Sequence, residues 1–145
     1  METGIVVRRL NLEDNEVISD LSAQLGYPVP ADLIQKHILE INNHQDHCAF
    51  AALHDGKVIG WIHAFFTIRI ESAPFVEIAG LVIDENYRRK SAGKELLEAV
   101  KGWALTQNVS TIKVRSNIFR LDAHEFYYCM GFMRLKDQRI FCLDL

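Results

Sequence analysis

Runs of apolar and β-branched residues predict strands along the first part of the chain. Such runs cover residues 5–8 (IVVR), 48–53 (CAFAAL) and 57–68 (KVIGWIHAFFTI). The dipeptide Asp55-Gly56 separates the second run from the third and is typical of a two-residue hairpin turn. Residues 75–84 (FVEIAGLVID) are apolar at nearly every position. We therefore expect residues 75–84 to form a central strand that is covered on both faces.

Apolar residues at helical spacing predict helices between these strands. The first helix is expected to begin at Asn11 and end at Gly26, and the second to begin at Pro30 and end at Asn42-Asn43. A third helix follows the central strand, with an apolar stripe from Ala92 to Ala104. A polar loop is expected between the two long strands, over residues 69–74.

The remaining chain predicts more strands and one more helix. Residues 111–116 (TIKVRS) have the character of a strand, and residues 121–130 (LDAHEFYYCM) that of a helix which Gly131 ends. Residues 132–135 (FMRL) and 139–145 (RIFCLDL) are expected to be closing strands. The order of elements predicts an α+β (mixed α/β) fold, in which helices cover both faces of a mixed sheet. We expect one domain over residues 1–145.

Composition narrows the class of protein. The chain has 145 residues, 49% of them hydrophobic, with a net charge of −3 and a pI near 6.0. This balance disfavours a general nucleic-acid-binding protein, which is usually basic. No apolar run approaches the about 20 residues that span a bilayer, and no secretory leader is recognisable, so no membrane association is expected.

Cysteine and histidine spacing gives no metal site. Three cysteines without a CxxC pair favour reduced thiols in a cytoplasmic protein. The pair His44-x-x-His47 lacks a third ligand and is interpreted as part of a polar loop. His63, within an apolar strand, is expected to be a hydrogen-bonded core histidine, with a position facing the cleft as the alternative.

A basic cluster lies between the central strand and the third helix. It contains Arg88, Arg89 and Lys90, with Lys94 one helical turn later and Gly93 between them. The start of a helix offers backbone N–H groups without partners, and the helix dipole attracts anions there. A glycine allows close approach to the backbone. These features predict a pyrophosphate site, and a solvated basic turn is the alternative.

The run LVIDENYRRKSAGKELL, residues 81–97, resembles the acetyl-coenzyme A motif of the GNAT N-acetyltransferase superfamily. In the pattern [RQ]-x-x-G-x-[GA], Arg88 takes the first place, Ser91 that of the first glycine, and Gly93 the last. LGYP at 25–28, the DGKVIGW hairpin and AHEFYYCMGF at 123–132 are similar to the family in the same order. The resemblance implies a GNAT-like fold with a mostly antiparallel sheet.

This resemblance implies acetyl-CoA as the co-substrate. The main chain of Leu81 to Ile83 is then expected to hold the acetyl carbonyl and the pantetheine arm, and N–H groups from residues 89–94 the pyrophosphate. If the backbone at position 91 needs positive φ, a serine there destabilises the fold by about 1 kcal/mol or more relative to glycine. If it does not, the Ser91 hydroxyl can donate another hydrogen bond. The residues expected to bind acetyl-CoA are Leu81, Val82, Ile83, Arg88, Arg89, Lys90, Ser91, Ala92, Gly93, Lys94 and Arg120.

Two residues are candidates for acid–base chemistry. Glu77 is a carboxylate within an apolar central strand, where burial is costly unless it is paired or faces a cleft. The resemblance implies that Glu77 removes the amine proton through water, and an ion pair with a neighbouring strand is the alternative. It also implies that Tyr127 donates a proton to the sulfur. The alternative is that Tyr127 and Tyr128 are core aromatics.

The expected function is the transfer of an acetyl group to a primary amine, by direct transfer in a ternary complex. We expect this amine to belong to a small molecule. Tyr27 and Glu71 are the candidate substrate-binding residues. A protein or peptide N-acetyltransferase, or a non-catalytic acyl-CoA sensor, is the alternative. Residues 139–145 could pair across a sheet edge, so a homodimer is possible.

Overall fold

The computed structural model describes residues 4–88 and 91–145. Contacts within the chain group it into two compact units, residues 1–114 and residues 115–145, and each is described by itself. Among the described residues, the first unit holds the sheet and three α-helices, and the second holds one α-helix and the C-terminal segment. The single domain over residues 1–145 stays a prediction.

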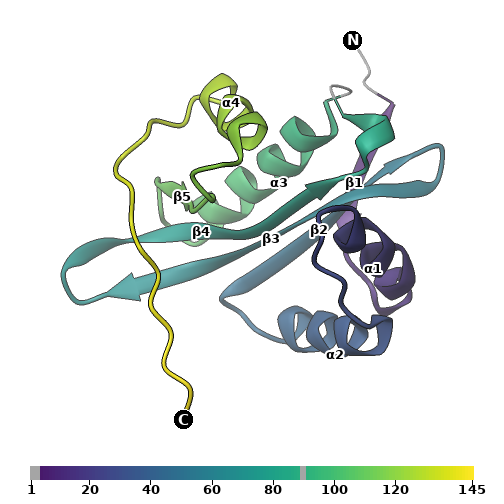
Figure 1. The fold of residues 1–145 in the computed structure, drawn as a ribbon, viewed down its shortest axis with the longest axis horizontal. Coiled ribbons are helices and arrows are strands. Elements are labelled where there is room, and N and C mark those ends of the chain that lie inside the picture. The colour runs from purple at the N-terminus through teal and green to yellow at the C-terminus, as the bar shows by residue number, and fades with distance from the viewer. Residues whose placement is uncertain (1–3, 89–90) are drawn as a thin grey trace. The chain divides into compact units, whose positions relative to one another are not determined.

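In the part of the chain that the structure describes, five strands form one sheet in sequence order (Figure 1). Neighbouring strands are antiparallel except for β4 and β5, which are parallel. The predicted fold class, mixed α and β with a mostly antiparallel sheet, is confirmed. The strands are β1 (Ile5–Arg9), β2 (His47–His54), β3 (Lys57–Arg69), β4 (Ser72–Ile83) and β5 (Ile112–Val114).

Helices cover both faces of the sheet in the first unit, as predicted. α1 and α2 lie on one face, and α3 lies on the other (Figure 1). Two short 3-10 helices, η1 and η2, precede α1 and α3. The helices are η1 (Leu12–Asp14), α1 (Asn15–Gln24), α2 (Ala31–Asn42), η2 (Glu85–Tyr87), α3 (Ala92–Thr106) and, in the second unit, α4 (Leu121–Cys129).

The core is built from the apolar stripes that the sequence predicts. On the α1/α2 face, Ile18 and Leu21 of α1 and Ile34 and Ile38 of α2 pack with buried strand residues such as Ala49. Because side chains alternate along a strand, Cys48 belongs to the opposite face, which α3 covers. The buried side chains of α3 are Ala92, Leu96, Leu97, Val100 and Ala104.

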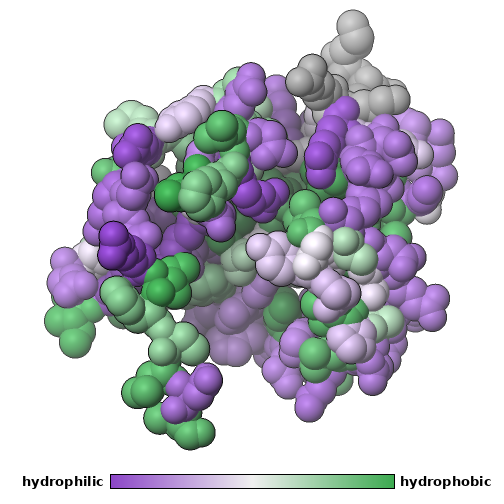
Figure 2. Space-filling model, viewed as in Figure 1, coloured by the Kyte–Doolittle hydropathy of each residue, from purple (hydrophilic) through white to green (hydrophobic). Residues whose placement is uncertain are grey.

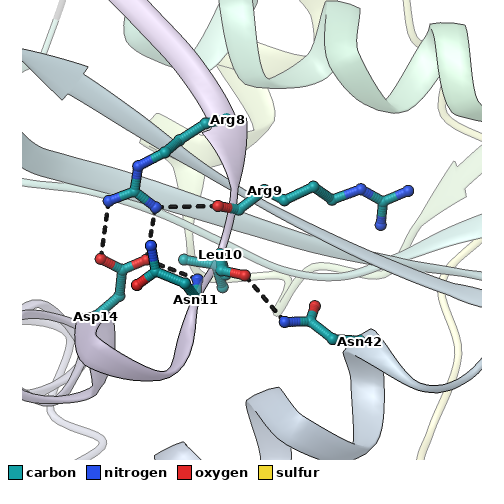
Figure 3. A network of polar contacts seen from close by, with 6 residues as sticks. All are labelled: Arg8, Arg9, Leu10, Asn11, Asp14 and Asn42. Carbon is teal, nitrogen blue, oxygen red and sulfur yellow. Dashed lines mark hydrogen bonds and ion pairs between the residues drawn. The ribbon is translucent and has the colours of Figure 1, made fainter.

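Polar contacts fix the path from β1 into the first two helices (Figure 3). Arg8 donates two hydrogen bonds to Asp14, from Nη1 to Oδ2 at 2.8 Å and from Nη2 to Oδ1 at 3.0 Å. The Asn11 N–H donates to the same carboxylate at 2.9 Å, and the Asn42 amide donates to the Leu10 carbonyl at 3.0 Å. Burial acts to raise the pKa of Asp14, but these hydrogen bonds outweigh it and leave the pKa lowered.

Two turn predictions had opposite outcomes. Asp55 and Gly56 both have positive φ, 50° and 78°, so the predicted two-residue hairpin turn is confirmed. The predicted loop over residues 69–74 is wrong, because only Ile70 and Glu71 lie between β3 and β4. Pro74 is part of β4, where the pairing with β3 shifts register between Thr67 and Arg69, so its missing N–H removes no regular ladder bond.

The two predicted closing strands are also wrong. Residues 132–145 form no strand, and most of their side chains are exposed. The apolar pattern of a strand is present there, but a strand also needs backbone partners for its N–H and C=O groups. The predicted end of α4 is confirmed, since Gly131 follows it with a φ of 96°.

Candidate active site

A β-bulge interrupts the central strand β4. His63 of β3 is opposite Gly80, whereas the next residue, Ala64, is opposite Ile78, so Ala79 is an extra residue on β4. The indole of Trp61 covers Gly80: a Cβ atom built on Gly80 would lie 2.8 Å from the ring. Gly80 is therefore needed for the close packing beside the bulge.

Beyond the bulge, one edge of β4 is open. β5 pairs with Val76, Glu77 and Ile78 only, and no strand within the described ranges 4–88 and 91–145 pairs with that edge from Ala79 to Ile83. The Val76 N–H donates toward β5, to the carbonyl of Thr111 at 3.0 Å. The edge of β4 that faces β5 is thus hydrogen-bonded before the bulge, and after the bulge it has no strand partner among the described residues.

Backbone alternation shows which groups point to the open edge. The Asp84 N–H donates to the Ile59 carbonyl on β3 at 2.8 Å. Residues 84 and 82 therefore direct their N–H and C=O groups toward β3, while Leu81 and Ile83 direct theirs away from it. Of the three main-chain positions predicted to hold acetyl-CoA, Leu81 and Ile83 can present backbone groups to a ligand, and Val82 uses its own within the sheet.

The turn after β4 leads into the start of α3. Buried Asp84 accepts the Asn86 N–H at 2.9 Å, which fixes η2, and Arg88 ends η2 with an exposed side chain. Ser91 is the N-cap of α3 and accepts the Glu95 N–H at 2.9 Å. The next three N–H groups, from Ala92, Gly93 and Lys94, have no acceptor within the helix.

Ser91 adopts the left-handed conformation, with φ of 71° and ψ of 4°. Of the two alternatives that the sequence left open, positive φ therefore applies, and the serine hydroxyl makes no capping hydrogen bond. Lys94 is exposed, so a cation adjoins the helix start. Arg89 and Lys90, also predicted to bind acetyl-CoA, lie outside the described residues.

Glu77 is partly buried in β4, beside the start of the open edge. It is opposite Phe65 of β3 and in register with Lys113 of β5. The Lys113 ammonium lies 4.2 Å from the centroid of the Phe75 ring. A basic residue thus occupies the neighbouring strand, as the ion-pair interpretation of Glu77 requires. The position beside the bulge, at the start of the open edge, also suits a base.

Tyr127 belongs to the second unit, where its ring packs edge-on against Phe126 and Phe132, both at 5.4 Å between centroids. Burial raises the pKa of the Tyr127 phenol, and the charge of Arg120 opposes that shift only partly. The phenol therefore stays protonated at neutral pH and can donate. Arg120 occupies the N-cap position of α4.

Tyr27 and Glu71, the predicted substrate-binding residues, lie at opposite ends of β4. Glu71 is in the turn before β4. Gln24, close to Tyr27 in sequence, accepts the N–H of Glu85 at 3.2 Å, just after β4 ends. Since β4 has twelve residues, its ends are about 40 Å apart. The structure does not bring these two residues together.

The interpretation of His47 as part of a polar loop is wrong, because His47 begins β2 and lies beside His63 on the α1/α2 face. The Nδ1 atom of His47 lies 2.9 Å from the Nε2 atom of His63, and the two rings are stacked. Burial, and then the charge of His47, lower the pKa of His63 to about 4. The prediction that His63 is hydrogen-bonded is confirmed. Its partner could be found only from the β2–β3 register, in which His47 is opposite Phe65 and Ala49 is opposite His63.

A cavity of about 430 Å³ lies at the end of β1 and the start of β2. None of the residues predicted from the sequence as site residues lines it. Among the described residues, no group of three His, Cys, Asp or Glu side chains could hold a metal ion. The lining residues are Arg9, Asn42, Asn43, His44, Gln45, His47 and Trp103.

Comparison with known proteins identifies the class. Residues 15–132 match the model of the acetyltransferase (GNAT) family. The match covers most of the chain, so this protein belongs to the acetyltransferase (GNAT) family, and the predicted family is confirmed. No helix in the part of the chain that the structure describes is long and apolar enough to cross a membrane.

Curated relatives match part of the chain. An N-acetylaspartate synthetase of Xenopus tropicalis is 31% identical over 85 residues, which is 59% of this chain and 30% of the relative. The mouse N-acetylaspartate synthetase is 28% identical over 88 residues, 61% of this chain and 28% of the relative. The chain thus spans less than a third of the length of these relatives.

Solved structures match the fold over nearly the whole chain. The aminoglycoside 6'-N-acetyltransferase AAC(6')-Ih of Acinetobacter baumannii has a TM-score of 0.86 at 15% identity, covering 98% of this chain and 99% of that one. AAC(6')-Iy, in complex with a bisubstrate analogue of CoA, gives 0.85 at 20%, covering 97% and 99%. A GNAT acetyltransferase of Staphylococcus aureus gives 0.77 at 24%, covering 97% and 99%. At these identities the similarity establishes the fold.

Proposed function

We propose that this protein is an acetyl-CoA-dependent N-acetyltransferase that acts on a primary amine of a small molecule, by direct transfer in a ternary complex. The observation that carries the proposal is the left-handed Ser91 directly before α3. After Ser91 the helix starts, and the N–H groups of Ala92, Gly93 and Lys94 in its first turn are suited to binding a diphosphate. Arg88, Arg89 and Lys90 precede this turn in the sequence and add positive charge.

The open edge of β4 supports a site for the thioester arm. Leu81 and Ile83 direct backbone N–H and C=O groups away from β3 over this stretch. An extended pantetheine arm carries amides that can bond to such groups, as an added strand does. The open edge and the start of α3 both belong to the first unit, and η2 connects them.

The chemistry requires a proton acceptor and a proton donor. The neutral amine attacks the thioester carbonyl carbon, a C–N bond forms, and the C–S bond breaks with its electron pair leaving on sulfur. In the proposal Glu77 accepts the amine proton through a water molecule, and Tyr127 donates its phenolic proton to the sulfur. Tyr127 is protonated at neutral pH and so can donate, and burial, which raises its pKa, keeps it protonated while making it a weaker acid.

From the names of the relatives we infer that the acceptor is a small amine. N-acetylaspartate synthetases are named for an amino-acid product, and the aminoglycoside acetyltransferases for polyamine sugars. These two classes of acceptor carry opposite net charges. An acceptor panel should therefore contain both, together with lysine-containing and free N-terminal peptides for the alternative of a protein acetyltransferase.

Three free cysteines support a reducing, cytoplasmic location in this proposal. Cys48 is fully buried, and burial raises the pKa of its thiol to about 12, so it is not an acyl carrier. Cys129 and Cys142 are exposed. Direct transfer without an acyl-enzyme is consistent with this distribution.

A thiol-release assay over the acceptor panel tests the proposed function, with reactions that lack an acceptor as the control for the exposed cysteines. We expect release of CoA with at least one small amine. Thermal unfolding with acetyl-CoA provides the second readout, because a ligand at about 100 times its dissociation constant adds about 2.7 kcal/mol to the free energy of unfolding. Stabilisation without release from any acceptor would indicate an acyl-CoA sensor. Release with peptides alone would indicate a peptide acetyltransferase.

A further inference from the structure

Two basic side chains of the first unit lie against one aromatic ring of β4. The Lys113 ammonium is 4.2 Å from the centroid of the Phe75 ring, and the Arg69 guanidinium carbon is 5.3 Å from it. The sum of these distances limits the separation of the two charges to 9.5 Å. Like charges repel at this distance, so the ring, or an anion that binds between the charges, must offset the repulsion.

These cations lie on the same face of the sheet as Glu77. Side chains two residues apart on a strand share a face, so Phe75 and Glu77 do, and Lys113 is in register with Glu77. Glu77 is opposite Phe65, which shares its face with Trp61 of the α1/α2 core. β3 and β4 extend past α1 and α2 to their hairpin (Figure 1), and hydrophilic side chains lie next to these helices in that direction (Figure 2). The cations therefore border the same region as the candidate base.

Neither cation is neutralised by an acidic partner. Among the described residues, Arg69 and Lys113 form no ion pair. Glu71, two residues from Arg69, is exposed in the β3–β4 turn. Lys113 is partly buried, and a cation that loses water without gaining a carboxylate is destabilised. An anion bound beside Arg69 and Lys113 would therefore neutralise charge that the protein itself leaves unbalanced there.

We propose that the acceptor is an amine that carries a carboxylate, as an amino acid does, and that Lys113 and Arg69 bind this carboxylate. The inference rests on the proposed function, in which Glu77 accepts the amine proton. Neighbouring strands are about 4.8 Å apart, so an amine near Glu77 and a carboxylate at Lys113 lie within the span of one small molecule. A polycationic acceptor would bring like charge toward both cations. Of the two classes of acceptor above, the charges favour the amino acid.

Acceptors that differ in their number of carboxylates test this charge preference. L-aspartate has two carboxylates, L-alanine has one and ethylamine has none. We expect kcat/KM, expressed per neutral amine, to fall along this series, by about tenfold or more from L-aspartate to ethylamine, because hydrogen bonds to a charged group are lost. An aminoglycoside should be a poorer acceptor than L-aspartate. Equal values for the three acceptors, or a preference for the aminoglycoside, would overturn the proposal.

Substitutions separate carboxylate binding from packing on the ring. Lys113→Met keeps a long side chain against Phe75 and removes the charge, and Arg69→Gln removes the second charge. Each should raise KM for L-aspartate about tenfold with little change in kcat, whereas Lys113→Arg should stay near wild type. Lys36→Gln, at an exposed position of α2, is the control for net charge. Variants of Lys113 and Arg69 that behave like Lys36→Gln would assign both cations to packing alone.

Calorimetric titration with L-aspartate, with CoA present, gives a readout that does not depend on turnover. We expect wild type to bind L-aspartate and Lys113→Met to bind it about tenfold more weakly. Such binding without release of CoA in the acceptor assay would support the carboxylate site and contradict acetyl transfer. Release of CoA with amines that lack a carboxylate, but not with L-aspartate or L-alanine, would support acetyl transfer and contradict the carboxylate site.

Discussion

The Nε2 atom of His63 lies 2.9 Å from the Nδ1 atom of His47, so two imidazoles on neighbouring strands are joined by a hydrogen bond. The hydrogen bond requires one ring nitrogen to donate and the other to accept, so it is lost once both rings are protonated. Burial and the neighbouring His47 lower the pKa of His63 to about 4. Burial, and then the charge of His44, lower the pKa of His47, and Asp46 opposes this shift only partly.

This pair predicts acid-sensitive stability. The unfolded chain binds a proton at His63 near pH 6.5, whereas the folded chain binds it near pH 4. The contribution of neutral His63 to the free energy of unfolding is therefore fully present above pH 6.5 and is lost as the pH falls to about 4. This contribution is roughly 3 kcal/mol at most. Urea unfolding at several pH values should show a smaller loss in His63→Gln. His37→Gln, on the exposed side of α2, is the control and should retain the wild-type dependence.

Ser91→Gly is expected to stabilise the protein. Serine at a φ of 71° costs about 1 kcal/mol that glycine does not, and the hydroxyl makes no capping bond that would be lost. The gain is partly offset by the greater freedom of glycine in the unfolded chain. Thermal unfolding measures the difference. Ser91→Ala keeps the Cβ atom and should gain nothing, and an equal gain in both variants would show that positive φ is not the cause.

Tyr127→Phe is expected to lower turnover about a hundredfold while leaving acetyl-CoA binding unchanged. Loss of a general acid typically costs this much, and the ring contacts with Phe126 and Phe132 are kept. Tyr128→Phe is the matched control, because Tyr128 is the adjacent tyrosine and is exposed. Steady-state kinetics on the best acceptor measures both variants. Equal turnover in the two would remove Tyr127 from the mechanism.

The variant Glu77→Gln distinguishes two roles of Glu77, that of a catalytic base and that of a partner in a structural ion pair. A base matters most at pH values where the acceptor amine is protonated, so the rate deficit of the variant should shrink as the pH rises toward the pKa of the amine. The measurement is kcat/KM against pH, with Glu40→Gln, at an exposed position of α2, as the control. A deficit that is constant with pH and accompanied by a lower melting temperature would assign Glu77 to the sheet rather than to proton transfer.

Much of the fold could be predicted because it follows from local patterns. The β2–β3 hairpin follows from Asp55-Gly56, the end of α1 from Gly26, and the position of α3 from its apolar stripe. The predicted start of α3 near Ser91 is confirmed as well. In each case the residues that specify the element lie within a few positions of one another, so tertiary contacts did not override them.

The rest depends on pairing that a single sequence does not reveal. The contact between Trp61 and Gly80 and the bond between His47 and His63 both require the strand register. Residues 132–135 and 139–145 have the apolar pattern of strands without strand partners in the described chain. The extension of β4 back to Ser72 was hidden by Pro74, which is tolerated where the pairing shifts register.

The most direct test of the account is an NMR titration of the ¹⁵N-labelled protein with acetyl-CoA, following backbone amides. The account predicts that the largest shift changes fall on Ala92, Gly93 and Lys94, with further changes at Leu81 and Ile83 on the open edge of β4. Saturating acetyl-CoA that leaves the amides of Ala92, Gly93 and Lys94 unmoved would contradict it.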